Sequence, residues 1–293
     1  MKINIIKNTL WAIAAGLVFA GCQKEDRPSL SSDYPQDANP PGGPLKFYAA
    51  FDGSTSNSLM NAVDSIKATF PAENTLTNGE GISGKGLLGE NKKFVKYSKP
   101  NDWAALSKSF TISFWEKKDG QTKNNTGTNG PEYPFSFKAL KAKPDNTNGY
   151  PQGGNMFLLF EGNNAATAIK LYTVDANMGD SWLAWEGGTT VANILDNKWH
   201  HIVLVYDAAT SGLTLYIDGV ANSHIPNWGG GTHGNINIDD SKITEFRIGA
   251  GPGTNYDTDD WLSSTWKGSL DQFRFYDVVL TQAEITSLFQ NKM

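Results

Sequence analysis

The stretch that decides the fold covers residues 199–219, WHHIVLVYDAATSGLTLYIDG. Its first part, Trp199 to Tyr206, is apolar at odd and even positions, which is typical of a strand covered on both faces. Its second part, Leu213 to Ile217, alternates in polarity and predicts a half-buried strand. The polar segment between them predicts a hairpin loop, and Asp218-Gly219 favours a two-residue turn. The stretch therefore predicts an antiparallel meander.

Short strand patterns continue on both sides of this meander. Phe110 to Trp115 alternates with a period of two. Further strands are predicted at residues 47–51, 94–97, 156–160, 169–173, 181–185, 245–249 and 269–276. One helix is predicted to start at Thr281, where Glu284 can complete a capping box. Together with 30 glycines for tight turns, these patterns predict an all-β fold, an antiparallel β-sandwich or jelly roll with a short C-terminal helix.

The N-terminus has the pattern of an export signal. Lys2 and Lys7 precede an apolar run from Leu10 to Ala20 that is too short to span a bilayer. Residues 1–21 are therefore predicted to be a signal peptide. The only cysteine of the chain, Cys22, follows directly, so no internal disulfide is expected.

The run Phe19-Ala20-Gly21-Cys22 resembles the lipobox of bacterial lipoproteins, with Phe19 where leucine is usual. The resemblance implies cleavage before Cys22 and lipidation of its thiol, and two acyl chains suffice for stable attachment. Residues 23–26, QKED, resemble the tag of Bacteroidetes-type lipoproteins that reach the outer face of the outer membrane. A solvated charged tether is the alternative. We expect an outer membrane lipoprotein that faces the exterior and touches the membrane only through its lipid.

Composition separates a stalk from a single folded domain. Residues 22–44 contain five prolines and no apolar run, which predicts a disordered stalk. Residues 45–293 are of a length that one all-β domain can have. The net charge is −5 and no cluster of Lys and Arg is interleaved with aromatic residues, so a nucleic acid partner is not expected.

The predicted domain resembles the laminin G-like, concanavalin A-like jelly-roll domains of bacterial surface proteins. The pieces that carry the resemblance are residues 51–53, 84–86, 110–115, 199–219, 268–276 and 280–285, in the order of the family. The resemblance implies this jelly roll for residues 45–293. It leaves the activity open, because the fold hosts lectins, adhesion modules and glycan-processing enzymes.

The sequence lacks the carboxylate motif of the β-glucan-cleaving enzymes that this fold resembles. Those enzymes carry Glu-x-Asp-x-x-Glu on one strand, which places the three carboxylates on one face. Here Glu116-Lys117-Lys118-Asp119 has the wrong order, and neither Glu161 nor Glu186 has a carboxylate two or three residues away. We therefore expect no enzymatic activity, and a hydrolase or lyase with carboxylates on separate strands is the alternative.

A buried aspartate is predicted near the C-terminus. Asp271 shares the parity of Phe273 and Phe275 and is expected to point towards the core, where a carboxylate needs partners. The partners are either backbone amides of a neighbouring loop or Ca²⁺, which prefers oxygen ligands. The family resemblance implies Ca²⁺ at this place, with Asp271 and Asp52 as ligands.

Sugar binding usually involves an aromatic ring against the apolar face of a pyranose, with amides or carboxylates that hydrogen-bond its hydroxyls. Trp228 precedes three glycines, and Tyr256 and Trp261 flank an acidic loop with Asp257 and Asp259. We predict that these five residues bind the ligand. Trp182 and Trp185 beside Glu186, and the insertion at 120–154, are further candidates.

These patterns predict a surface-anchored, non-catalytic, lectin-like lipoprotein that captures glycans or serves adherence. The first alternative is an adhesion module that recognises a protein through its loops. The second is the glycoside hydrolase with a dispersed site. The sequence does not specify the sugar or its linkage.

Overall fold

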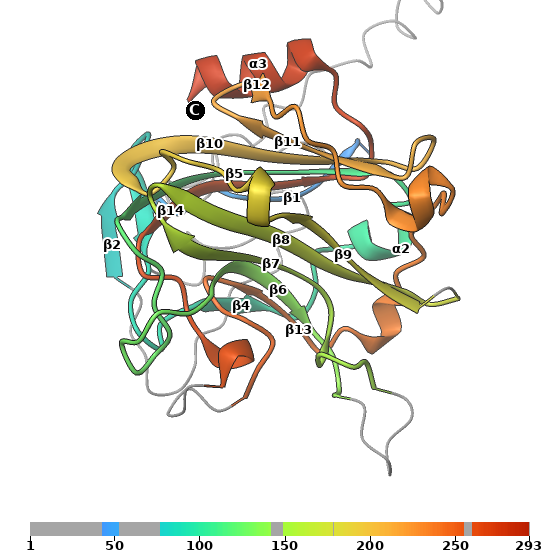
Figure 1. The fold of residues 1–293 in the computed structure, drawn as a ribbon, viewed down its shortest axis with the longest axis horizontal. Helices are drawn as coiled ribbons and strands as arrows, with labels where there is room; N and C mark the ends of the chain where they lie inside the picture. The colour runs from blue at the N-terminus through green and yellow to red at the C-terminus, as the bar shows by residue number, and fades with distance from the viewer. Residues whose placement is uncertain (1–42, 53–76, 142–148, 178, 255–259, 293) are drawn as a thin grey trace, which may run out of the picture. The chain divides into compact units, whose positions relative to one another are not determined.

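The computed structural model describes residues 43–52, 77–141, 149–177, 179–254 and 260–292. Within them, two antiparallel sheets form a sandwich (Figure 1). In spatial order, sheet A contains β12 (Val220–Ala221), β11 (Gly212–Ile217), β10 (Asp196–Asp207), β5 (Phe110–Asp119), β14 (Ser269–Tyr276), β3 (Lys85–Leu88) and β2 (Thr77–Glu80), with β1 (Leu45–Ala49) also paired to β14. Sheet B contains β4 (Val95–Tyr97), β13 (Glu245–Ile248), β6 (Glu132–Lys138), β7 (Gly154–Asn163), β8 (Ala166–Asp175) and β9 (Gly179–Trp185).

The helical elements are short. They are α2 (Trp103–Leu106), α3 (Gln282–Asn291) and the 3₁₀ turns η2 (Gly187–Thr189), η3 (Trp228–Gly231), η4 (Asp240–Lys242) and η5 (Trp261–Ser263). No helix in the described ranges is long and apolar enough to cross a membrane. The predicted signal peptide, Cys22 and nearly all of the predicted stalk lie outside the described residues.

The meander of residues 199–219 is confirmed. β10 lies between β5 and β11, and its pairing with β11 runs from Ile202 opposite Ile217 to Asp207 opposite Gly212. Asp218 and Gly219 have φ of 52° and 80°, the positive values that a two-residue hairpin turn requires. The apolar residues at both parities of β10 are explained by its position, because the core covers one face and α3 the other.

The core between the sheets is largely aromatic. Alternate side chains of β5, Phe110, Ile112 and Phe114, are fully buried in it. The Phe275 ring on sheet A contacts Phe246 of sheet B, with ring centroids 5.2 Å apart and nearly perpendicular planes. Edge-to-face packing of this kind adds about 0.5–1.5 kcal/mol per pair to the burial of apolar surface. Such contacts hold the two sheets against each other.

Helix α3 covers the outer face of sheet A, beside β10 and β11 (Figure 1). The predicted capping box is present: the Glu284 amide donates to Thr281 Oγ1, and Thr281 N donates to Glu284 Oε2 at 2.7 Å. Ile285 is fully buried against Val203 and Val205 of β10. The C-terminal helix is therefore part of the folded domain.

The insertion predicted as a long loop at 120–154 contains strand β6. Sequence reasoning missed this strand because Pro134 removes a backbone donor within it and polar residues surround it. Pro134 lies at a register irregularity between Glu132 and Phe135, where the ladder with β7 is interrupted. A proline is tolerated at such a place because no ladder hydrogen bond is required of it.

Candidate ligand-binding site

A pocket of about 440 Å³ opens on the outer face of sheet B. It is lined by Pro131, Leu159, Glu161, Lys170, Trp182, Glu186 and Trp261. Side chains alternate along a strand, so Leu159 and Glu161 of β7 share the face opposite Leu158 and Phe160 of the core. The lining residues come from β7, β8, β9 and loops that are distant in sequence.

One end of the pocket is aromatic. Strand register aligns Phe157, Tyr172 and Trp182 across β7, β8 and β9. The Trp182 ring packs on Tyr172 with centroids 5.0 Å apart, and Trp261 of η5 lies 6.2 Å from Trp182. Trp182 and Trp261 remain 39% and 37% exposed. This exposure leaves two indole surfaces available to a ligand.

The other end is charged. Lys170 Nζ lies 2.7 Å from Glu186 Oε2 and 3.7 Å from Glu161 Oε2. The two carboxylate oxygens are therefore at most about 6.4 Å apart, the sum of these two distances. Both glutamates are about half exposed. We call Glu161, Lys170 and Glu186 the charged clamp.

Local structure holds Glu186 at the end of β9. It precedes η2, and its backbone N–H donates to Thr189 Oγ1 at 3.1 Å. Thr189 Oγ1 in turn donates to the Glu186 carbonyl at 2.9 Å. The hydroxyl thus satisfies backbone groups that the end of the strand leaves without ladder partners, and the position of Glu186 is fixed.

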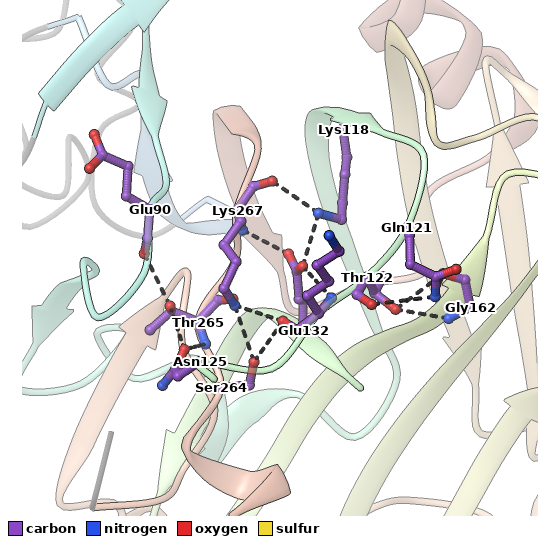
Figure 2. A network of polar contacts seen from close by, with 11 residues as sticks. Glu90, Lys118, Gln121, Thr122, Asn125, Glu132, Gly162, Ser264, Thr265 and Lys267 are labelled. Carbon is purple, nitrogen blue, oxygen red and sulfur yellow. Dashed lines mark hydrogen bonds and ion pairs between the residues drawn. The ribbon is translucent and has the colours of Figure 1, made fainter. Parts of the chain in front are cut away.

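A polar network surrounds Glu132 (Figure 2), which follows the pocket residue Pro131 in the chain. The fully buried Glu132 accepts hydrogen bonds from Lys123 N at 2.8 Å and Lys267 N at 2.7 Å. Lys118 Nζ lies 2.9 Å from Glu132 Oε1, and its side chain is only 4% exposed. One carboxylate therefore ties β5, the 121–131 loop and the segment before β14 together.

The same region fixes Trp261. Tyr133 of β6 donates its hydroxyl to the Trp261 carbonyl at 2.9 Å. Asp260 caps η5, with Oδ1 accepting from Leu262 N at 3.3 Å and Oδ2 accepting from the Ser263 hydroxyl at 3.1 Å. Asn125 Nδ2 donates to the Ser263 carbonyl at 2.7 Å. Trp261 is thus carried by a short turn with several attachments.

The five predicted ligand residues do not come together in one site among the described residues. Trp261 lies in the pocket, whereas Tyr256, Asp257 and Asp259 fall outside the described residues. Trp228, which is predicted to bind the ligand, is instead only 8% exposed and belongs to the core cluster. Three glycines with positive φ follow it and turn the chain back, so that its ring stacks on His233 at 3.7 Å.

The predicted parity of Asp271 is also wrong. The register of β14 against β5 shifts between Asp271 and Arg274, where Gln272 has a φ of 47°. The core-facing residues of β14 are therefore Leu270, Phe273 and Phe275. Asp271 is nevertheless fully buried, and burial raises the pKa of its carboxyl to about 7.

The two aspartates predicted as calcium ligands hold one loop. Asp271 Oδ2 accepts from Ile82 N at 2.8 Å, and Asp52 Oδ1 accepts from Lys85 N at 3.0 Å. A side chain at Gly84 would bring its Cβ close to Asp52 Oδ1. Backbone amides are thus partners of both carboxylates. A Ca²⁺ ion would have to share these oxygens, and no group of three or more His, Cys, Asp or Glu is gathered among the described residues.

The architecture and the site can be compared with known proteins. Residues 90–286 match the model of the family described as the concanavalin A-like lectin/glucanases superfamily. The chain belongs to this superfamily. No curated protein matches the chain.

Solved structures of this superfamily fold are similar but distant in sequence. One is domain 4 of a GH43 extracellular arabinanase from Geobacillus stearothermophilus in complex with arabinotriose, with a TM-score of 0.55, 15% identity, and coverage of 84% of this chain and 98% of that one. Another is the botulinum neurotoxin serotype G binding domain, with a TM-score of 0.53, 13% identity and 85% coverage of this chain. The chain spans about half (51%) of that structure.

A third is the binding domain of botulinum neurotoxin DC in complex with SialylT, with a TM-score of 0.54 and 12% identity over 85% of this chain and 52% of that one. At these sequence identities the similarity extends to the fold alone. A similar fold is thus present in an arabinanase domain and in toxin binding domains. The fold alone does not specify a function.

Proposed function

We propose that the protein is a non-catalytic carbohydrate-binding module whose ligand occupies the pocket on the outer face of sheet B. The observation that carries the proposal is the pair of exposed indoles, Trp182 and Trp261, beside the charged clamp. An indole covers the apolar face of a pyranose, while carboxylates and an ammonium hydrogen-bond its hydroxyls. A concave, largely apolar site with a few converging polar groups is the usual form of a small-ligand site.

The comparisons support a sugar as the ligand class. The arabinanase domain of similar fold was solved with arabinotriose, and it matches over 98% of its length. The proposal for this chain rests on its pocket, and the similarity to the arabinanase domain is additional support.

We further propose that the module is anchored at the cell surface by a lipid on Cys22 and serves glycan capture or adherence. Support comes from the lipobox-like run before Cys22 and the proline-containing stalk after it. A calcium ion held by Asp52 and Asp271 is a separate proposal, which chelation of the purified protein tests.

Hydrolysis is the second candidate, favoured by the short distance between Glu161 and Glu186. Retaining glycosidases hold their two carboxyl groups about 5–5.5 Å apart, which the limit of about 6.4 Å allows. Against it, Lys170 lies between the two carboxylates and contacts both. In a glycosidase that space belongs to the scissile bond. The arrangement therefore favours binding over cleavage.

The decisive experiment is a glycan array with the purified protein, followed by mass analysis of each glycan that binds. We expect binding without shortening of the glycan. Trp182→Ala and Trp261→Ala should each lower affinity at least about tenfold, which corresponds to about 1.4 kcal/mol. Trp199→Ala is the matched control, because Trp199 is a partly exposed tryptophan on sheet A.

Three results would contradict the proposal. Silence across the array would favour the alternative, a module that recognises a protein. Shortened glycans would favour the hydrolase. Full affinity in both pocket variants would mean that the glycan binds elsewhere.

A further inference from the structure

We propose that the pocket selects neutral sugars that present two adjacent hydroxyls to the charged clamp, and that it rejects sugars carrying a carboxylate. This inference rests on the proposed function and names the ligand class of the same site. It follows from the donors, acceptors and charges that converge at the pocket.

The donor and acceptor inventory of the clamp favours hydroxyls. A lysine ammonium has three N–H donors. Glu186, at 2.7 Å, lies within hydrogen-bond distance of Lys170, whereas Glu161, at 3.7 Å, contacts it only as an ion pair. The ammonium therefore keeps donors for a ligand oxygen, and the two half-exposed carboxylates have more free lone pairs than it has donors. A ligand must mostly donate hydrogen bonds here. Adjacent hydroxyls fit, because one can donate to a glutamate while its neighbour accepts from Lys170.

The charge of the clamp disfavours acidic sugars. Two carboxylates face one ammonium, and Lys170 is the only cation among the described residues that line the pocket. The polar end therefore carries an excess of one negative charge. A uronic or sialic acid would bring a further carboxylate, which has no proton to donate and which the clamp would repel.

The spacing of the rows suits a single sugar ring. Trp182 pairs with Tyr172 of β8, and Ala184 of the same strand pairs with Lys170. The aromatic row and the lysine row are thus two residues apart, about 7 Å along the strands. A ring lying against Trp182 would place the hydroxyls of one edge at the clamp. Aromatic contact and hydroxyl recognition can therefore act on one sugar unit.

Negative charges also lie near the aromatic end of the pocket. The pKa of Tyr172 is raised, first by burial and then by the charge of Asp180. Similarly, burial raises the pKa of Tyr133, with Asp260 and Glu161 contributing through their charges. The charges that contribute to the two shifts, those of Asp180, Asp260 and Glu161, are negative and would also repel an anionic ligand.

The test compares neutral and acidic polysaccharides on the same protein at fixed, low ionic strength. The neutral probes are arabinan, galactan and xyloglucan, and the acidic probes are polygalacturonate, alginate and hyaluronan. We expect at least one neutral probe to bind and every acidic probe to bind at least tenfold more weakly. A Glu161→Gln/Glu186→Gln double variant should lower affinity for the neutral probe at least tenfold and bind acidic probes more tightly than the parent protein, because Lys170 is then unopposed. Glu80→Gln, an exposed glutamate of β2 on sheet A, is the matched control, and thermal melts verify that all variants fold.

The outcomes separate this inference from the proposed function. If the parent protein binds an acidic probe as tightly as a neutral one, the charge selection is wrong and the carbohydrate-binding function stands. The same conclusion follows if the double variant keeps its affinity and preference. If no probe of either class binds and the glycan array is also silent, the proposed function itself fails, and this inference with it.

Discussion

Glu132 links three segments beside the pocket through its carboxylate. Its carboxylate is fully buried, receives two backbone N–H groups and lies 2.9 Å from Lys118 Nζ. A buried ion pair of this kind is costly to break, because the remaining charge stays buried without its partner. The segments before and after the pocket rim therefore depend on this one side chain.

We expect Glu132→Gln to lower the free energy of unfolding by about 3–5 kcal/mol. The measurement is urea denaturation of the parent and variant proteins. Glycan affinity of the folded fraction should also fall, because Pro131 adjoins Glu132 and lines the pocket. Glu90→Gln is the control: its ion pair with Lys93 is 45% exposed on the glutamate side, so a loss below about 1 kcal/mol is expected. Equal losses in the two variants would contradict the assignment.

Residue patterns predict part of the site. Trp261 is predicted as a ligand residue from its position in a polar stretch, and the structure places it in the pocket. The same argument places Trp228 outside the core, which is wrong, since glycine-rich surroundings do not determine where the chain folds back. In the sequence, Glu161, Lys170 and Glu186 are separate residues in or beside three different strands. Their meeting depends on the register of β7, β8 and β9, which a sequence alone does not specify.

At the scale of elements, β10 carries two neighbouring histidines in opposite environments. His200 lies between Asp218 and Asp196, at 2.9 and 3.0 Å, and the hydrogen bond to Asp218 is the main cause of its raised pKa. His201 is fully buried and shares a 2.9 Å hydrogen bond with the Ser113 hydroxyl. Burial lowers the pKa of His201 to about 3.

The contributions of the two histidines to stability are both complete near the ordinary histidine pKa of about 6.5. A raised pKa in the folded state means that the contribution of His200 is complete below about 6.5 and is lost as pH rises through the folded value. The lowered pKa of His201 means the reverse: its contribution is complete above the ordinary value and is lost as pH falls towards about 3. Of the two histidines, His200 therefore acts on the alkaline side of the stability profile and His201 on the acid side.

Denaturation curves at a series of pH values check this prediction. We expect His200→Gln to flatten the alkaline side of the profile. His201→Gln should flatten the acid side only. A variant profile parallel to that of the parent protein on both sides would show that the histidine in question does not contribute.

Helix α3 offers a second prediction at this scale. Thr281→Ala removes the hydroxyl that accepts from the Glu284 amide, and loss of such a cap costs about 1 kcal/mol. Calorimetry should show a lower Tm for the whole domain, since Ile285 packs on β10. Thr286→Ala, a threonine within the same helix that takes no part in the capping box, serves as the comparison. Melting of the helix well below the domain would contradict its place in the cooperative unit.

At the scale of the whole molecule, the predicted Ca²⁺ would join three strands. Asp52 follows β1, Asp271 lies on β14, and both hold the loop before β3. We expect EDTA to lower the Tm of the purified protein, because removing a ligand that binds only the folded state lowers its apparent stability. Asp271→Asn should abolish this response. An unchanged Tm of the parent protein after chelation would contradict the calcium prediction.

The fold as a whole is predictable because its signals are local and repeated. Period-two alternation, the Asp218-Gly219 turn and the Thr281 capping box each depend on a few neighbouring residues. Strand β6 and the bulge at Gln272 are not predictable in this way. Pro134 contradicts the strand pattern locally, and the bulge lies in a strand that pairs with β5 on one side and with β1 and β3 on the other.

Because of the position of β14, sheet A can form completely only after residues 269–276 have been synthesised. The last strand of the chain lies inside sheet A, with β5 on one side and β1 and β3 on the other. Until residues 269–276 emerge from the ribosome, those three strands have open edges that invite pairing with other chains. Contacts between segments so far apart in sequence also form slowly. A newly made chain therefore depends on its final strand for protection against aggregation.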